Sequence, residues 1–137
     1  MRVLTVLLAL ACGVAMADQS PSPAGAAVYI IKPAAGARVK SPVTVVFGLK
    51  GMGIAPAGVK FDNTGHHHLL IDSELPADLT QPLPVSDNIR HFGKGQTETT
   101  LDLPPGKHTL QLLFADYTHT PFVPNVASSR ITITVTK

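Results

Sequence analysis

Histidine is the residue type whose number and spacing in this sequence most directly indicate chemistry. Three of the six histidines are consecutive, at His66, His67 and His68. Side chains of a β-strand point alternately to its two faces, with a rise of about 3.3 Å per residue. His66 and His68 would therefore share one face and could bind one metal ion together, while His67 would point to the other face.

A metal site needs further ligands from elsewhere in the chain, and His91 and His119 are the candidates. Neutral imidazoles without a thiolate suit copper(II), zinc or nickel, and affinities for divalent ions peak at copper. Met52 lies between two glycines, where a thioether would favour copper(I). We predict a site for a copper ion, with zinc as the alternative; its candidate ligands are His66, His68, His91, His119 and His67, with Met52, Asp116 and His108 as additional candidates.

Several of these residues also have a structural interpretation. His67 could be a partly buried core residue, and His108 continues the apolar face that Leu110 and Phe114 share, which favours a structural role. Asp116 could orient an imidazole or be an ordinary solvated carboxylate. A histidine cluster can also sense pH, although nothing in the sequence specifies such a sensor.

The elements that must position these residues are predicted to be β-strands. Apolar residues alternate with polar ones with a period of two, most clearly in residues 43–49 and 131–135, and no segment of ten residues has helical periodicity. Proline and glycine separate these segments, as in Pro104-Pro105-Gly106. We predict an all-β fold, an immunoglobulin-like antiparallel β-sandwich of about seven strands, with strands near Val28, Val45, Leu69, His91, Thr99, Leu112 and Ile133.

This topology makes a prediction about the histidines. If successive strands alternate in direction, the loops after the second, fourth and sixth strands emerge at one end of the sandwich. These are the segments around residues 51–65, 91–95 and 116–129. Five histidines would then lie at that end, and His108 would lie at the opposite end.

The N-terminus has the pattern of a secretory signal peptide at residues 1–17. Arg2 precedes an apolar stretch, and Ala15-Met16-Ala17 is a cleavage site of the small-x-small type. An alternative is lipid attachment at Cys12, although a leucine three residues earlier is missing. We therefore expect a periplasmic or secreted protein.

The mature chain is then expected to begin with a flexible lead-in at residues 18–25, followed by a β-sandwich domain at residues 26–137. Cleavage would remove Cys12, the only cysteine. The mature domain would then have no thiol nucleophile, no iron–sulfur ligation and no blue-copper site, since each requires a cysteine.

Composition argues against two classes of partner. Eleven Lys and Arg residues face nine Asp and Glu residues, and the basic residues are scattered rather than clustered with aromatic ones. This is not the pattern of a nucleic-acid-binding surface. The only long apolar run is at the N-terminus and is too short to span a membrane. We expect no nucleic-acid partner and no membrane span.

Enzymatic catalysis is not the function that we expect. No serine stands in a nucleophile elbow, and no two carboxylates are placed as an acid–base pair. We predict a small exported metal-binding protein that handles copper. Two alternatives remain: a non-catalytic interaction module of the cell envelope, which binds a protein or glycan through its long loops, and a copper-dependent oxidoreductase.

Three blocks of this sequence are similar to a known family. They are GHHHLLID at Gly65–Asp72, HFGKGQTETTLDLPPGKHTLQL at His91–Leu112, and the closing ITITV. The chain resembles the bacterial domain of unknown function 4399 from Val28 onward. The resemblance implies an exported immunoglobulin-like domain without an established activity, with family histidines at all six histidine positions. It also implies a further histidine where this chain has Phe122, and if that histidine is a ligand in relatives, the site here is weaker.

Overall fold

The computed structural model describes residues 18–137, so the predicted signal peptide at residues 1–17 and the alternative of a lipidated Cys12 lie outside the described residues. Every regular element of residues 18–137 is a β-strand, and this part of the chain has no helix with the length and apolarity that crossing a membrane requires. The strands are β1 (Ala27–Lys32), β2 (Arg38–Lys40), β3 (Val43–Lys50), β4 (Gly53–Ile54), β5 (Thr64–Ile71), β6 (Ile89–His91), β7 (Glu98–Leu101), β8 (Gly106–Ala115), β9 (Pro121–Ala127) and β10 (Ile131–Thr136).

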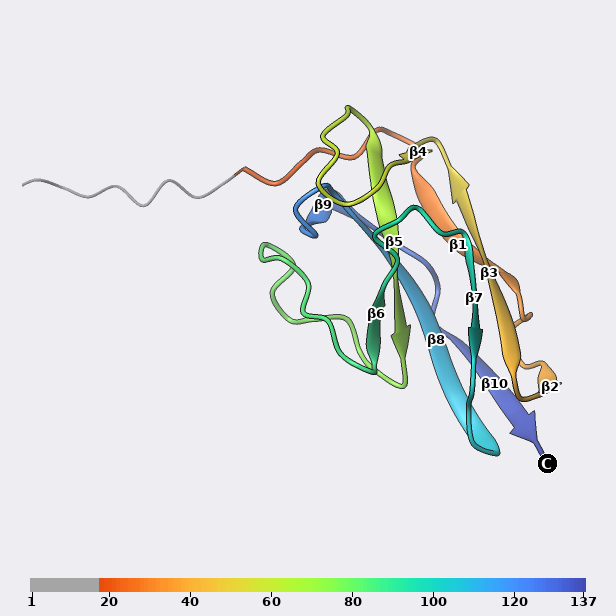
Figure 1. The fold of residues 1–137 in the computed structure, drawn as a ribbon. Helices are drawn as coiled ribbons and strands as arrows, with labels where there is room; N and C mark the ends of the chain where they lie inside the picture. The colour runs from red at the N-terminus through yellow and green to blue at the C-terminus, as the bar shows by residue number, and fades with distance from the viewer. Residues whose placement is uncertain (1–17) are drawn as a thin grey trace, which may run out of the picture.

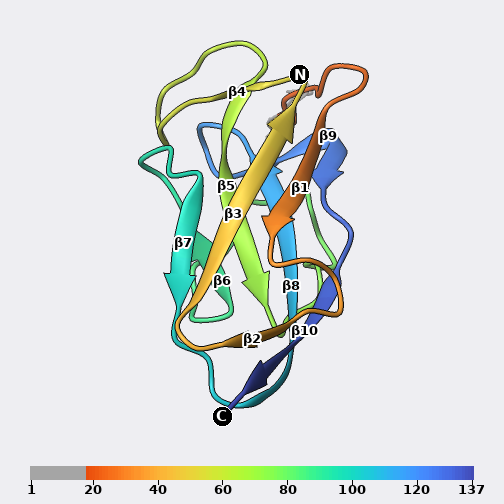
Figure 2. The same ribbon diagram turned by 90° about the vertical axis from the view of Figure 1, so that its right-hand side faces the viewer.

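The strands form two sheets that face each other (Figures 1 and 2). The first sheet has the order β1-β3-β7, and the second has the order β2-β10-β8-β5-β4, with β6 paired to β5 and β9 paired to β8. The predicted all-β sandwich is therefore confirmed. Its assignment to the immunoglobulin type stays a prediction.

One strand joins a different sheet from the one that the constant-type immunoglobulin pattern implies. In that pattern the fourth strand belongs to the sheet of the first, second and fifth strands. Here the strand at His91, β6, pairs antiparallel with β5 in the second sheet, and His91 lies directly opposite His68. This pairing brings two candidate ligands side by side.

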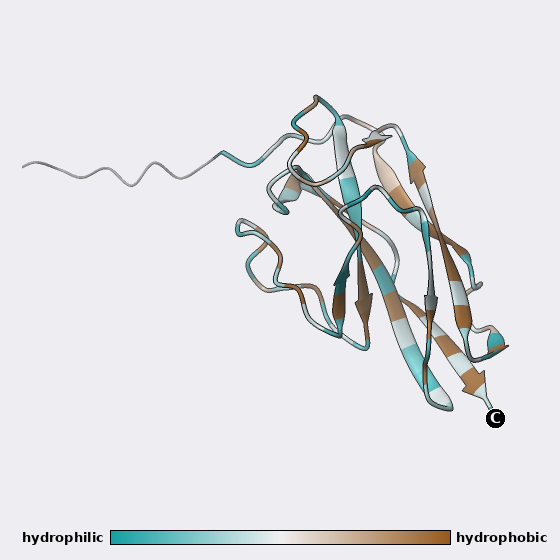
Figure 3. Ribbon diagram, viewed as in Figure 1, coloured by the Kyte–Doolittle hydropathy of each residue, from teal (hydrophilic) through white to brown (hydrophobic). Residues whose placement is uncertain are grey.

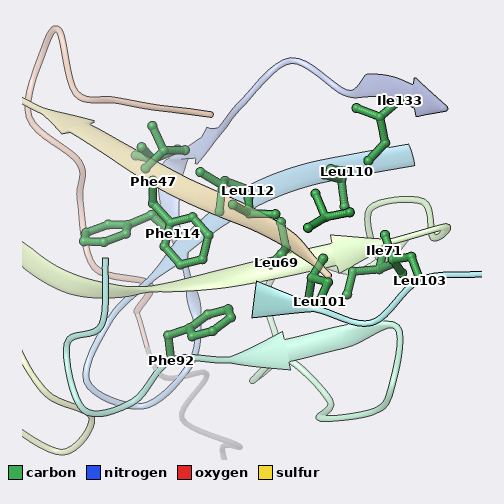
Figure 4. Close-up of a cluster of buried hydrophobic side chains, with 14 of the residues drawn as sticks. Phe47, Leu69, Ile71, Phe92, Leu101, Leu103, Leu110, Leu112, Phe114 and Ile133 are labelled. Carbon is green, nitrogen blue, oxygen red and sulfur yellow. The ribbon is translucent and has the colours of Figure 1, made fainter. Parts of the chain in front are cut away.

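The main core lies between the two sheets (Figure 4). Strand alternation sends every second residue of β5 and β8 into it, and Figure 3 shows the corresponding hydrophobic and hydrophilic bands along β3, β8 and β10. Burial of each large apolar side chain contributes about 1.5–3 kcal/mol. The residues of the main core with no exposed surface are Val45, Leu69, Leu101, Leu110, Leu112, Phe114 and Ile133.

The outer face of the second sheet is also covered. The intervening residues of β5 and β8, among them Leu70 and Leu113, pack in a second, smaller cluster with Leu83 and Ile89. Leu83 belongs to the irregular segment 72–88, which Figure 1 shows on the side of β5 and β6 that faces away from β3. Strand β5 is therefore buried on both faces, and a polar side chain on its outer face can be shielded from water.

Residues 18–25, which we predicted to be a flexible lead-in, are instead attached to the domain. The backbone N–H of Ser22 donates to the carbonyl of Val123, and the N–H of Val123 donates to the carbonyl of Ser20, both at 3.0 Å. Pro21 forms a parallel bridge with Val123. This segment therefore runs beside β9, because the chain after β8 turns back and presents unpaired backbone groups to it.

Candidate metal centre

Four histidines from three separate stretches of the chain meet beside the outer face of the second sheet. His66 and His68 lie on β5, His91 ends β6, and His119 lies in the loop between β8 and β9. One ring nitrogen of each lies within 4.8 Å of the corresponding nitrogens of the other three. The structure thus brings together four of the five histidines that were predicted to converge, and it places them on the outer face of the second sheet.

Strand pairing places three of these rings. His66 and His68 point to the same face of β5 because they are two residues apart, and their ring centroids lie 4.9 Å apart. The ring of His91 lies 4.9 Å from that of His66 and 5.2 Å from that of His68, as the pairing of β6 with β5 requires. The ring arrangement therefore follows from backbone register.

A tight loop places the fourth ring. His119 has a φ of 67°, a left-handed conformation that costs a non-glycine residue about 1–2 kcal/mol. The loop is built around Asp116, whose Oδ1 accepts hydrogen bonds from the backbone N–H of Thr118 at 2.9 Å, from its hydroxyl at 2.7 Å and from the N–H of Thr120 at 3.1 Å. The N–H of His119 also donates to the Asp116 carbonyl at 2.9 Å. These bonds offset the strain, and strain concentrated at one residue is typical of functional sites.

Gly93 makes room for His91. A Cβ atom at position 93 would lie 2.2 Å from Cε1 and 2.5 Å from Nε2 of His91, far inside van der Waals contact. We predicted a loop around residues 91–95, but not the need for a glycine at position 93. The sequence signal that could have indicated this requirement was the spacing of two residues between His91 and Gly93. Residues two apart in an extended chain point to the same side.

Burial favours the neutral form of His66, His68 and His91. His66 and His68 have no exposed surface, whereas His91 and His119 are partly exposed. Desolvation, followed by repulsion from the neighbouring histidines, lowers the pKa of His66 to about 4 and that of His68 to about 3. Burial, then His119, also lowers the pKa of His91. Neutral imidazoles carry the lone pair that a metal ion needs.

The ring nitrogens are close and incompletely paired. Nε2 of His66 lies 3.0 Å from Nδ1 of His119 and 3.2 Å from Nε2 of His91. Four nitrogens bound tetrahedrally at about 2.0–2.1 Å would lie about 3.3 Å apart, so these spacings fit ligands of one ion. Nδ1 of His66 and both nitrogens of His68 are buried without a hydrogen-bond partner among the described residues, an arrangement that costs about 1–3 kcal/mol per group.

Two other predicted candidates, His67 and Met52, lie apart from the four. His67 points into the main core, where its ring centroid is 5.0 Å from those of both Phe47 and Phe114; burial lowers its pKa to about 4. Met52 packs against the same main core. Strand alternation explains why His67 points away from His66 and His68. We therefore correct the prediction that His67 binds the same ion as these two residues.

His108 has the structural role that its position in an apolar face favours. It lies at the other end of β8, where Nδ1 contacts Oδ2 of Asp72 at 2.7 Å and Nε2 contacts the carbonyl of Pro104 at 2.8 Å. Burial lowers the pKa of His108, but the Asp72 and Pro104 hydrogen bonds and the Asp72 charge outweigh it and raise the pKa overall. Both ring nitrogens are occupied, so we correct its prediction as a metal ligand.

Two further positions named in the sequence analysis, Asp116 and Phe122, are not placed as ligands of the four-histidine site. Asp116 is next to the cluster, and its charge raises the pKa of His66 against the larger effects that lower it. Its Oδ1 accepts hydrogen bonds from its own loop, and its Oδ2 accepts one from the hydroxyl of Ser20. Phe122 belongs to the main core and stacks on Phe114 at 6.0 Å. A histidine at position 122 would therefore replace a side chain of the main core and would not be placed beside the four-histidine cluster.

Comparison with known proteins identifies a family but no characterised relative. A family model described as Domain of unknown function (DUF4399) matches residues 45–136, more than half of the chain, so the chain belongs to this family. No curated protein matches the chain, and no solved structure matches it.

Proposed function

We propose that this member of the DUF4399 family is an exported, periplasmic protein that binds and handles copper through His66, His68, His91 and His119. The observation that carries the proposal is the meeting of four imidazoles, two of them fully buried, with nitrogens within 4.8 Å of one another. Burying the polar rings of His66 and His68 without partners for their nitrogens is unfavourable. A metal ion is the partner that satisfies all four lone pairs.

The chemistry of the ligands favours copper. All four donors are imidazole nitrogens, and residues 18–137 contain no cysteine, so the site lacks the soft thiolates that are typical of many structural zinc sites. For nitrogen ligands the affinity of divalent ions peaks at copper(II). Zinc is the competing ion, because it also accepts imidazole ligands in tetrahedral geometry.

The burial of the ligands supports handling of the ion. The two fully buried rings on β5 form the inner side of the site, while the partly exposed rings of His91 and His119 form its outer side. An ion can therefore enter and leave past these two rings without the sandwich opening. The exported location is supported by the signal-peptide pattern of residues 1–17.

Calorimetric titration of the metal-free protein with copper(II) and zinc(II) tests the proposal. We expect one copper ion per chain, a Kd below micromolar, and weaker binding of zinc. Replacing one ligand, in His66→Ala, should weaken copper binding by at least about 100-fold, since even residues that only orient a ligand are worth about 10–100-fold. Wild-type binding no tighter than micromolar would reject the proposal.

His67→Met is the matched control. It removes a histidine between two candidate ligands, but one that points to the opposite face and contacts Phe47 and Phe114. Methionine has a similar volume and packs well against aromatic rings. Copper affinity should be unchanged in this variant; a loss equal to that of His66→Ala would contradict the assignment of ligands.

A further inference from the structure

The N-terminal segment, residues 18–25, contacts both chain segments that hold His119. These are the loop between β8 and β9 and the irregular segment 72–88. Backbone hydrogen bonds fix residues 20–22 beside Val123 of β9. From this position the side chains of Gln19 and Ser20 extend to the neighbouring loops, while that of Ser22 turns to the carbonyl of Pro124 at 2.7 Å. In Figure 1 the segment crosses the end of the sandwich at which the loop after β8 lies.

Ser20 completes the shell of hydrogen bonds around Asp116. Its hydroxyl donates to Oδ2 of Asp116 at 2.7 Å, while Oδ1 is occupied by the N–H groups and hydroxyl of the loop itself. Asp116 is only 5% exposed, and a hydrogen bond to a buried carboxylate is stronger than one between neutral groups. Ser20 is therefore the fixed external support of the loop that carries His119.

Gln19 supports the other side of His119. Its amide nitrogen donates to the carbonyl of Leu79 at 2.7 Å and to that of Pro121 at 3.0 Å. Leu79 belongs to the segment 72–88, and the N–H of Leu83 in the same segment donates to the carbonyl of His119 at 2.9 Å. The strained backbone of His119 is thus held between two segments that the N-terminal segment joins.

We propose that Ser20, acting through Asp116 and assisted by Gln19, is a positioning residue that holds the ring of His119 in the four-histidine site. The inference rests on the proposed metal-binding function and deepens it, because it makes docking of the N-terminal segment a condition for full affinity. A ring that must hold its nitrogen within about 0.2 Å of a bonding distance is sensitive to such support.

Three variants of the full chain test this inference. Ser20→Ala should weaken copper(II) binding by about 10–100-fold, the usual effect of a residue that orients a ligand, and should change the electron paramagnetic resonance spectrum of bound copper(II). Ser20→Thr keeps the hydroxyl and should restore both. Ser22→Ala, which removes a hydroxyl from the same segment without touching Asp116, should match the wild type, as should the circular dichroism of all three variants.

A second measurement on the metal-free protein separates this inference from the proposed function. The imidazole NMR signals of His119 should shift in Ser20→Ala and stay unchanged in Ser22→Ala. Copper binding and NMR signals of Ser20→Ala that equal those of the wild type would overturn the positioning role while leaving the metal site intact. If the wild type bound neither copper nor zinc, the proposed function would fail, and the NMR comparison alone would decide whether Ser20 positions His119.

Discussion

Gly93→Ala is the substitution that most directly tests the geometry of the four-histidine site. The added Cβ would lie 2.2 Å from Cε1 of His91 and 2.5 Å from its Nε2. Gly93 does not have a positive φ, so alanine can adopt its backbone conformation without strain. The added Cβ would also lie 3.2 Å from the Cβ of Ala57, a contact that a small shift relieves, so the substitution acts mainly on the ring of His91.

The size of the effect follows from these distances. Carbon atoms in contact prefer about 3.5–4.0 Å, so the ring must retreat by about 1.3 Å or more. Metal–nitrogen bonds tolerate about 0.2 Å, and the displaced ring can no longer bind the same ion. We expect copper affinity to fall as it does on removal of one ligand, by at least about 100-fold, which corresponds to about 2.8 kcal/mol.

Copper titration of the metal-free wild type and of metal-free Gly93→Ala measures this loss of affinity. Thermal unfolding of the two proteins is followed in parallel. Gly53→Ala is the matched control, because its Cβ would meet only the Cγ2 methyl of Thr64 at 3.2 Å, a contact that a small shift relieves. This control should bind copper like the wild type. Equal copper affinity and an equal copper spectrum in Gly93→Ala would refute the placement of His91 as a ligand.

Three further predictions concern stability. His67→Met should raise the free energy of unfolding in urea by about 1–3 kcal/mol, because it removes two buried ring nitrogens that have no hydrogen-bond partner within residues 18–137. A loss of stability would count against this explanation. Copper at about 100 times its Kd should stabilise the domain by about 2.7 kcal/mol and raise the Tm by roughly 10 °C, reversibly with a chelator, and an unchanged Tm would argue against a site specific to the folded state. The raised pKa of His108 means that its pairing with Asp72 stabilises the fold below the unfolded pKa of about 6.5 and that this contribution is lost as pH rises through the raised value. Asparagine, like aspartate, tolerates the φ of 51° observed at position 72. Asp72→Asn should therefore destabilise the domain at pH 5.5 more than at pH 9, by up to about 1 kcal/mol because Asp72 is partly exposed. The same loss of stability at both pH values would exclude the ion pair as its cause.

The pairing of His66 with His68 was predictable because alternation along a strand is a local property. The same alternation predicted that His67 points away from them, and the contacts of His67 with Phe47 and Phe114 follow from it. The gathering of loops at one end required only that successive strands alternate in direction. These predictions use neighbours within a few residues and the most general rule of sandwich topology.

Other features of the site depend on pairings that no local pattern specifies. Nothing near His91 indicates that β6 pairs with β5 rather than with the first sheet, yet this choice sets His91 opposite His68. The polar, proline-rich segment after Asp18 suggested flexibility, but Gln19 and Ser20 have partners that lie 60 to 102 residues away. Such contacts depend on how remote segments are arranged in the folded chain.

The sequence by itself determined the β-sandwich and the two-residue spacing that aligns His66 with His68, because the period of a strand is built into its backbone geometry. Only the tertiary structure decided that His91 and His119 join them on the outer face of the second sheet, and that Gly93 and Asp116 make this possible. The physical reason is that ligand placement to a fraction of an ångström depends on strand pairing and close packing between remote segments, whose free energies arise only in the folded chain.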